Sequence, residues 1–136
     1  MTVFLSFIPS LKSTGFERKY HMQVIEKPWG REEVIELNDR YMVKRLTMWK
    51  GHRCSLQYHN TKCETIYVLS GQLKIYYGES PDALRSRNFS PGEAITLVPG
   101  VIHRMEGVED SVYLEASTPE MDDVVRIEDD YLRANT

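Results

Sequence analysis

From residue 28 onward, apolar and polar residues alternate along this chain with a period close to two. This period is typical of β-strands with one buried face, because successive side chains of a strand point to opposite sides of the sheet. Turn-forming pairs such as Lys50-Gly51, Ser70-Gly71 and Pro99-Gly100 separate the alternating segments. The pattern predicts strands at residues 31–37, 41–49, 54–59, 64–70, 72–77, 94–98, 103–107 and 112–117.

Many short strands at regular spacing predict an all-β fold, either a sandwich or a small barrel. The polar stretch 78–90 is expected to form a surface hairpin loop, and the tail 122–133 either a short helix or a last strand. A chain of 136 residues has room for one buried core, so nothing in its length argues for two domains.

The first 21 residues differ in character from the rest of the chain. They contain a short apolar patch without a preceding basic residue or a small-residue cleavage site, so they make a poor secretory signal. Their basic and Ser/Thr content leaves an organelle-targeting role open. We expect a poorly ordered extension at 1–21 and a single domain over 22–136, so a protein shortened to begin at Met22 should keep its activity and melting temperature.

Composition and charge exclude several classes of function. The net charge of -3 and the pI near 5.8 offer no broad basic surface, so nucleic acid is not an expected partner. The apolar stretches are too short to cross a membrane. Cys54 and Cys63 are the two cysteines and form no CxxC pair, which argues against a disulfide scaffold or a zinc ribbon. We expect reduced thiols in a cytoplasmic protein.

Four side chains that can bind a metal lie on short predicted strands flanked by glycines. Gln57 and His59 are two residues apart, so on a strand both leave the same face. Glu64 opens the next strand and His103 lies on a later one, so three segments would converge on one ion. Two neutral imidazoles, a carboxylate and an amide suit one divalent metal ion, with zinc expected first and manganese, iron, nickel or cobalt as alternatives.

The parity of the strands indicates which side chains point inward. Glu64 shares its face with Ile66 and Val68, which are natural inward residues of a narrow barrel. Lys44 shares a face with the apolar residues of the segment 42–48. A lysine on an apolar face needs a partner or a wet cavity, so this placement puts a cation beside the proposed metal.

The spacing of these residues resembles the two motifs of the cupin family. The first motif contains a glycine, two histidines, a glutamate and a second glycine, and the second contains two glycines, a proline, a histidine and an asparagine. Gln57 replaces the first histidine, the expected proline is displaced from position 98 to Pro99, and Gly107 replaces the asparagine. The resemblance implies a double-stranded β-helix, also called a jelly-roll barrel. The matching residues are Gly51, His59, Glu64, Gly71, Gly92, Gly100 and His103.

A narrower resemblance covers residues 28–133. The segments 27–30, 41–47, 55–59 and 123–129 are similar to the carboxy-terminal isomerase domain of type II mannose-6-phosphate isomerases. This resemblance implies a sugar-phosphate substrate, a homodimer, and Arg104 as a candidate active-site residue beside the last ligand. It implies Gln57, His59, Glu64 and His103 as the metal ligands. The nucleotidyltransferase domain of the bifunctional members is missing here, so guanylyl transfer is not expected.

The expected reaction is the interconversion of mannose 6-phosphate and fructose 6-phosphate through an enediolate. The metal ion would act as a Lewis acid on the developing charge, and Arg104 or Lys44 could add a positive charge or bind the phosphate. Glu115, His52 and Lys44 are the candidates for the general base. The sequence leaves open an ion-pairing role for Arg104, a structural role for Lys44 and an outward orientation for Glu115.

Two other functions compete with the isomerase. One is an iron-dependent cupin dioxygenase, against which Gln57 weighs because such sites usually contain more histidines. The other is a non-catalytic sugar-binding or regulatory cupin in which the ion only braces the barrel. The fold alone does not choose among them.

Overall fold

The computed structural model describes residues 2–7 and 19–133, and the side chains of residues 22–133. Secondary structure in this part of the chain consists of β-strands, turns and short irregular segments. No helix of the described residues is long and apolar enough to span a membrane. The strands are β1 (Thr2–Phe7), β2 (Lys19–Lys27), β3 (Gly30–Leu37), β4 (Met42–Met48), β5 (Leu56–Tyr58), β6 (Glu64–Ser70), β7 (Leu73–Gly78), β8 (Arg85–Phe89), β9 (Ala94–Leu97), β10 (Ile102–Gly107), β11 (Ser111–Ser117) and β12 (Val125–Glu128).

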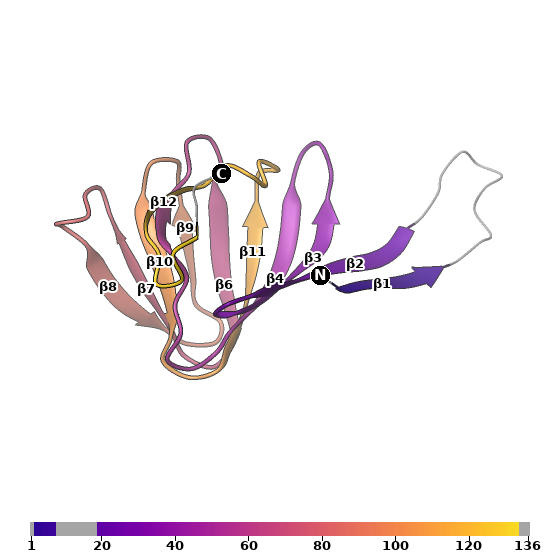
Figure 1. Cartoon of the computed structure of the whole chain (residues 1–136), viewed down its shortest axis with the longest axis horizontal. Helices are drawn as coiled ribbons and strands as arrows, with labels where there is room; N and C mark the ends of the chain where they lie inside the picture. The colour runs from indigo at the N-terminus through magenta and orange to yellow at the C-terminus, as the bar shows by residue number, and fades with distance from the viewer. Residues whose placement is uncertain (1, 8–18, 134–136) are drawn as a thin grey trace.

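The strands form two antiparallel sheets that face each other (Figure 1). The larger sheet has the order β1-β2-β3-β4-β11-β6-β9, and the smaller has the order β12-β5-β10-β7-β8. Strands from the second half of the chain lie between strands from the first half: β11 pairs with β4 and β6, and β10 pairs with β5 and β7. This interleaving brings residues far apart in the sequence to one site and confirms the predicted all-β fold.

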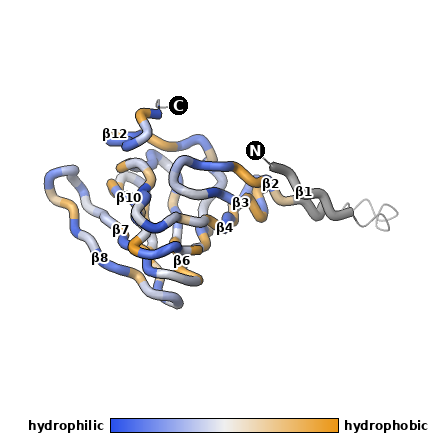
Figure 2. The backbone as a smooth tube through the Cα atoms, turned by 60° about the horizontal axis from the view of Figure 1, so that its bottom comes forward, coloured by the Kyte–Doolittle hydropathy of each residue, from blue (hydrophilic) through white to orange (hydrophobic). Residues whose placement is uncertain are grey.

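The alternation of the sequence becomes alternation of burial. In β4 the buried positions are Met42, Lys44, Leu46 and Met48, and in β6 the positions from Glu64 to Val68 alternate in the same way. Hydrophilic and hydrophobic residues accordingly alternate along the strands in Figure 2. Each fully buried aliphatic side chain contributes roughly 1.5–3 kcal/mol of hydrophobic stabilisation. The core consists of Trp29, Leu46, Met48, Cys54, Ile66, Val68, Leu73, Ile75, Phe89, Leu97, Met105 and Tyr113.

The structure explains why the residue that ends the first cupin motif is a glycine. Gly71 lies between β6 and β7 with a φ angle of 85°, in the left-handed region that favours glycine. A Cβ atom at this position would lie 2.3 Å from the carbonyl oxygen of Asp110. Any other residue would therefore displace the neighbouring turn.

Two segments differ from the sequence prediction. The expected loop 78–90 contains the strand β8, which pairs with β7 at the edge of the smaller sheet, so the prediction of a loop was wrong for residues 85–89. An edge strand can be polar on both faces, which removes the alternation on which the prediction depended. The tail forms the strand β12, which pairs with β5 and excludes the helical alternative.

The strand β2, which pairs with β3 over Gln23 to Lys27, was not predicted from the sequence. Neither was β1, which pairs with β2; these two strands extend sideways from the sandwich (Figure 1). β1 and residues 19–21 of β2 fall in the segment expected to be an extension, and residues 1 and 8–18 lie outside the described residues. The start of the folded domain near Met22 stays a prediction.

Candidate metal centre

Three of the predicted metal ligands meet in the interior between the two sheets. His59 follows β5, Glu64 begins β6 and His103 lies in β10, and all three side chains are buried. Their ligand atoms lie within 4.8 Å of one another. The Nε2 atoms of His103 and His59 are 3.0 Å and 3.5 Å from Oε1 of Glu64.

The protonation of the two imidazoles can be worked out from their other ring nitrogens. Nδ1 of His59 lies 2.5 Å from the carbonyl oxygen of Asp123, and Nδ1 of His103 lies 2.9 Å from that of Val101. A carbonyl oxygen only accepts hydrogen bonds, so each Nδ1 carries a proton, and the neutral form of each imidazole would have its lone pair on Nε2.

The donor set fits a divalent cation. The two Nε2 atoms and Oε1 of Glu64 are buried and have no hydrogen-bond partner among the described residues. Three buried electron-rich atoms that face one another are unfavourable unless a cation lies between them. Two imidazoles and a carboxylate are a common ligand set of zinc and related ions. The residues present therefore form a candidate metal centre.

The loop between β5 and β6 is held in place by Asp123. Its carboxylate accepts hydrogen bonds from the backbone N–H groups of Asn60, Thr61 and Lys62 at 2.6–2.9 Å. Desolvation raises the pKa of this carboxyl, but the three hydrogen bonds outweigh it and lower the pKa to about 2. Because the carbonyl group of Asp123 also accepts a hydrogen bond from His59, one residue orients both the loop and a candidate metal ligand.

Gln57 lies beside these ligands. It is directly opposite His103 in the β5–β10 pair, so both side chains leave the same face of the smaller sheet. Its Oε1 accepts a hydrogen bond from Oγ of Ser55 at 2.6 Å, and the side chain lines the same cavity as His59 and Glu64. Its role as a fourth ligand stays a prediction.

Lys62 is a component of the site that the sequence analysis missed. Its side chain is buried, with Nζ 3.1 Å from Oε2 of Glu64 and 3.0 Å from Oε2 of Glu115. Burial lowers the pKa of Lys62, but the charges of Glu115 and Glu64 outweigh it and raise the pKa above the usual value. Lys62 thus fixes one carboxylate oxygen of Glu64 while the other faces the histidines. Lys62 lies in the loop before β6, where no strand periodicity could mark it as inward.

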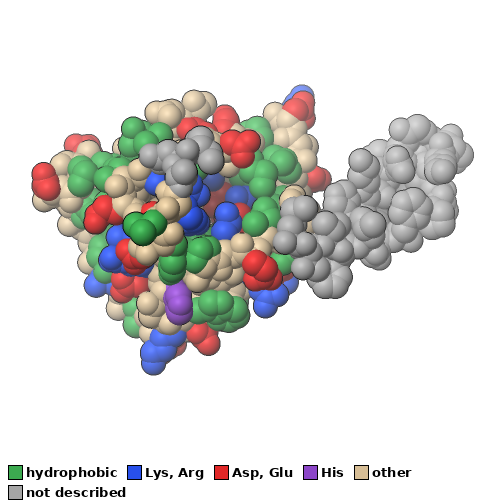
Figure 3. Space-filling view, in the orientation of Figure 1, with side chains coloured by type: hydrophobic (Ala, Val, Ile, Leu, Met, Phe, Trp, Pro, Cys, Tyr) green, Lys and Arg blue, Asp and Glu red, His purple; other side chains and the backbone are tan. Residues whose placement is uncertain are grey.

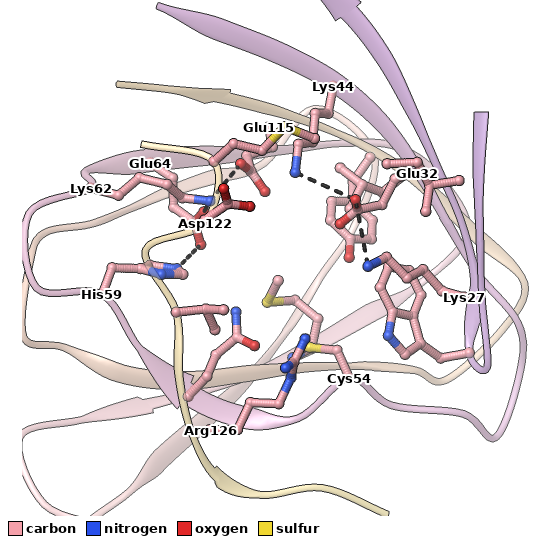
Figure 4. Close-up of a pocket in the computed structure, with 18 of the residues that line it drawn as sticks. Lys27, Glu32, Lys44, Cys54, His59, Lys62, Glu64, Glu115, Asp122 and Arg126 are labelled. Carbon is pink, nitrogen blue, oxygen red and sulfur yellow. Dashed lines mark hydrogen bonds and ion pairs between the residues drawn. The ribbon is translucent and has the colours of Figure 1, made fainter. Parts of the chain in front are cut away.

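The cavity beside these residues has a volume of about 260 Å³ and opens at the face seen in Figure 3, where Lys and Arg side chains gather in a hollow. Figure 4 shows charged side chains that point into it from both sheets. Cys54 also lines it, and burial raises the pKa of this thiol to about 11, so a thiolate is not available as a ligand. Both cysteines are free. The polar lining includes Lys27, Glu32, Lys44, Gln57, His59, Lys62, Glu64, Glu115, Asp122, Arg126 and Arg133.

Of the three predicted catalytic residues, Lys44 and Glu115 line the cavity and Arg104 does not. Lys44 and Glu115 are buried, oppose each other in the β4–β11 pair and line the cavity. Burial, and next the charge of Glu64, raise the pKa of Glu115. Their catalytic roles stay predictions.

Arg104 and His52 do not line this cavity. Arg104 follows His103 in β10, so its side chain leaves the opposite face of the sheet. There its guanidinium donates two hydrogen bonds to the carbonyl oxygen of Cys54 and lies 3.6 Å from Asp130. His52 is exposed, with Nδ1 3.1 Å from the carbonyl oxygen of Lys50.

Several curated proteins are similar in sequence to this chain, and two of them illustrate the likeness. The chain is 33% identical over 138 residues to the xanthan biosynthesis protein XanB of Xanthomonas campestris pv. campestris. This alignment covers 93% of this chain and 27% of the relative. It is 28% identical over 136 residues to the mannose-1-phosphate guanylyltransferase ManC of Salmonella typhimurium, covering 93% and 26%. The chain therefore spans about a quarter of the length of these relatives.

Comparison with solved structures and with family models agrees with this result. The structure of KdgF from Halomonas sp. matches with a TM-score of 0.65 and 18% identity over 74% of this chain and 90% of the other, a likeness that shows the fold alone. The predicted cupin fold is confirmed. The family model described as mannose-6-phosphate isomerase C-terminal matches residues 14–129. Because this match covers most of the chain, the protein belongs to the mannose-6-phosphate isomerase C-terminal family of cupin domains.

Proposed function

We propose that the protein is a metal-dependent aldose–ketose isomerase that interconverts mannose 6-phosphate and fructose 6-phosphate. The observation that carries the proposal is the set of three buried, unsatisfied ligand atoms of His59, Glu64 and His103 beside a cavity rich in charged groups. Membership in the isomerase family supports the choice of reaction. The positions of the ligands on both sheets support one bound divalent ion, with Gln57 as the fourth ligand and zinc as the first candidate.

Each step of the isomerisation needs a defined group. His59, Glu64 and His103 would hold the divalent ion, which would supply Lewis-acid chemistry to the open-chain sugar. Glu115 is the general base in this proposal: it is buried in the cavity, and its raised pKa suits proton exchange between neighbouring carbons. Lys44, opposite Glu115, supplies a positive charge near the reacting carbons.

The size of the cavity supports a small ligand. Its volume of about 260 Å³ lies below the range of roughly 300–1,000 Å³ that is usual for pockets of drug-sized molecules. A single sugar phosphate suits this volume better than a nucleotide sugar does. The proposal for this chain therefore does not include the guanylyl transfer that the name of its longer relative ManC states.

The proposal includes a cytoplasmic homodimer. Two free cysteines support the location. Tyr67 and Leu69 support the dimer, because both are 42% exposed on the outer side of β6 in the larger sheet. Light scattering of the purified protein would measure its mass, and a monomer at micromolar concentration would remove this part of the proposal.

A coupled assay for fructose 6-phosphate tests the reaction. The protein should convert mannose 6-phosphate when loaded with metal, lose activity on chelation and regain it when metal is restored. His59→Gln should abolish both metal binding and turnover, whereas His52→Gln, which alters an exposed histidine outside the cavity, should leave both unchanged. Metal-loaded protein without turnover would reject the isomerase and favour a sugar-binding cupin. Oxygen uptake with ferrous iron would favour a dioxygenase.

A further inference from the structure

A row of charged side chains crosses the inner face of the larger sheet from the metal centre to the opposite wall of the cavity (Figure 4). Beyond Lys62 and its two carboxylates, Nζ of Lys44 lies 3.4 Å from Oε2 of Glu32, and Nζ of Lys27 lies 3.9 Å from the same oxygen. Lys44 also lies directly opposite Glu115 across β4 and β11. We call this row the charged band, and its members in order are Glu64, Lys62, Glu115, Lys44, Glu32 and Lys27.

The two ends of the charged band differ in their balance of charge. At the metal end, Lys62 lies between two carboxylates. At the far end, Glu32 is shared by Lys44 and Lys27. Two further cations, Arg126 and Arg133, line the same cavity, and the guanidinium of Arg133 is paired with the carboxylate of Asp129.

These cations lie within electrostatic reach of one another. Burial lowers the pKa of Lys27, Glu32 raises it, and the positive charges of Lys44, Arg133 and Arg126 lower it further. A partly buried group of like charges costs free energy in the empty pocket. An anion bound among them would remove this repulsion, so the arrangement favours an anionic ligand.

The register of the smaller sheet places Arg126 two strands away from His103. Arg126 on β12 lies opposite Gln57 on β5, which in turn lies opposite His103 on β10. Two strand steps separate the Arg126 and His103 backbones by about 10 Å. This distance is comparable with the length of an extended six-carbon sugar that carries a phosphate at its last carbon. Arg126 shares the cavity face with Gln57 because directly opposed residues leave the same side of a sheet.

We propose that Lys27 and Arg126, with Arg133 beside them, form the phosphate subsite of this pocket, at the end opposite His59 and Glu64. This inference rests on the proposed function, because it assigns the far end of the same pocket to the phosphate of the sugar. The guanidinium of Arg126 would bind two phosphate oxygens as a planar fork, and Lys27 would act as a mobile point charge. The sugar chain would then extend along the charged band toward the metal ligands.

The test measures binding to metal-free protein, in which the ion cannot bind phosphate and turnover does not interfere. Inorganic phosphate, mannose 6-phosphate and mannose are titrated into chelated protein and followed by calorimetry. We expect saturable binding of the two phosphate-bearing probes. Lys27→Gln and Arg126→Gln should each weaken that binding by about tenfold or more, since each removes a charge-assisted hydrogen bond. The control Lys50→Gln, which alters an exposed lysine outside the cavity, should bind as the wild type does.

A comparison of the ligands separates this subsite from a general loss of structure. The weakening should be confined to inorganic phosphate and mannose 6-phosphate, and the affinity for mannose should not change. If Lys27→Gln does not fold, Arg126→Gln carries the test. The proposal is overturned if the wild type shows no saturable phosphate binding, or if folded variants bind phosphate as tightly as the wild type. Failure of the proposed function gives a different result: phosphate binding that depends on Lys27, without conversion of mannose 6-phosphate by metal-loaded protein.

Discussion

The substitution Lys62→Met tests how the buried charges at the metal centre are balanced. Nζ of Lys62 lies 3.0 Å from Glu115 and 3.1 Å from Glu64, and all three side chains are at most 6% exposed. At an effective dielectric constant near 20, each contact is worth about 5 kcal/mol of Coulomb energy, most of which offsets the desolvation of the charges. Removing the cation leaves two buried carboxylates without it. We expect the free energy of unfolding to fall by about 3–5 kcal/mol.

The measurement is urea denaturation of chelated protein at neutral pH, followed by a thermal melt. The expected loss corresponds to a decrease in melting temperature on the order of 10 °C. The double variant Lys62→Met/Glu115→Gln also removes one of the two carboxylates that have lost their lysine partner, so it should regain part of the stability. Lys50→Met is the control, and a substitution at such an exposed position should change the free energy by less than about 0.5 kcal/mol. A loss below about 1 kcal/mol in Lys62→Met, or no recovery in the double variant, would refute the reasoning.

Three further predictions concern the metal, the pH dependence and the reaction. Zinc at 100 times its dissociation constant should stabilise the wild type by about 2.7 kcal/mol, and this gain, measured by thermal melts, should disappear in His59→Gln and persist in His52→Gln. The folded-state pKa of Asp123 lies below its unfolded value, so the stability that this carboxylate contributes is present above about pH 4 and is lost as the pH falls toward 2. In Asp123→Asn, the free energy of unfolding should therefore change less between pH 4 and pH 2 than it does in the wild type. Glu115→Gln should lower kcat for mannose 6-phosphate isomerisation by about 100-fold or more with a smaller change in KM, and an unchanged kcat would assign the base elsewhere.

The convergence of three candidate metal ligands could be predicted because their positions follow from strand parity and motif spacing. His59, Glu64 and His103 lie on or next to strands whose alternation is clear in the sequence, so their inward orientation followed. The same rule explains the position of Arg104. A residue adjacent to an inward ligand leaves the other face of the strand, so proximity to His103 in the sequence did not place Arg104 in the cavity.

Other parts of the site depend on contacts that no local pattern encodes. Lys62 belongs to a turn, where parity has little meaning, and its partner Glu115 lies 53 residues away in the sequence. Asp123 contacts the β5–β6 loop only because the tail returns to pair β12 with β5. Strand β8 lies at a sheet edge, and its residues 85–88 are exposed, so its sequence shows no alternation of apolar and polar residues. Its pairing with β7 depends on the closed sandwich rather than on alternation.

The division of the ligands between the sheets links metal binding to folding. His103 belongs to the smaller sheet and His59 follows its strand β5, whereas Glu64 begins β6 of the larger sheet. An ion bound by all three would therefore join the two sheets, and its binding free energy would add to the stability of the closed sandwich. Without an ion, the three unsatisfied atoms oppose that closure. Lys62 reduces the opposition by pairing with the other carboxylate oxygen of Glu64, which gives a buried lysine beside a candidate cation site a structural role.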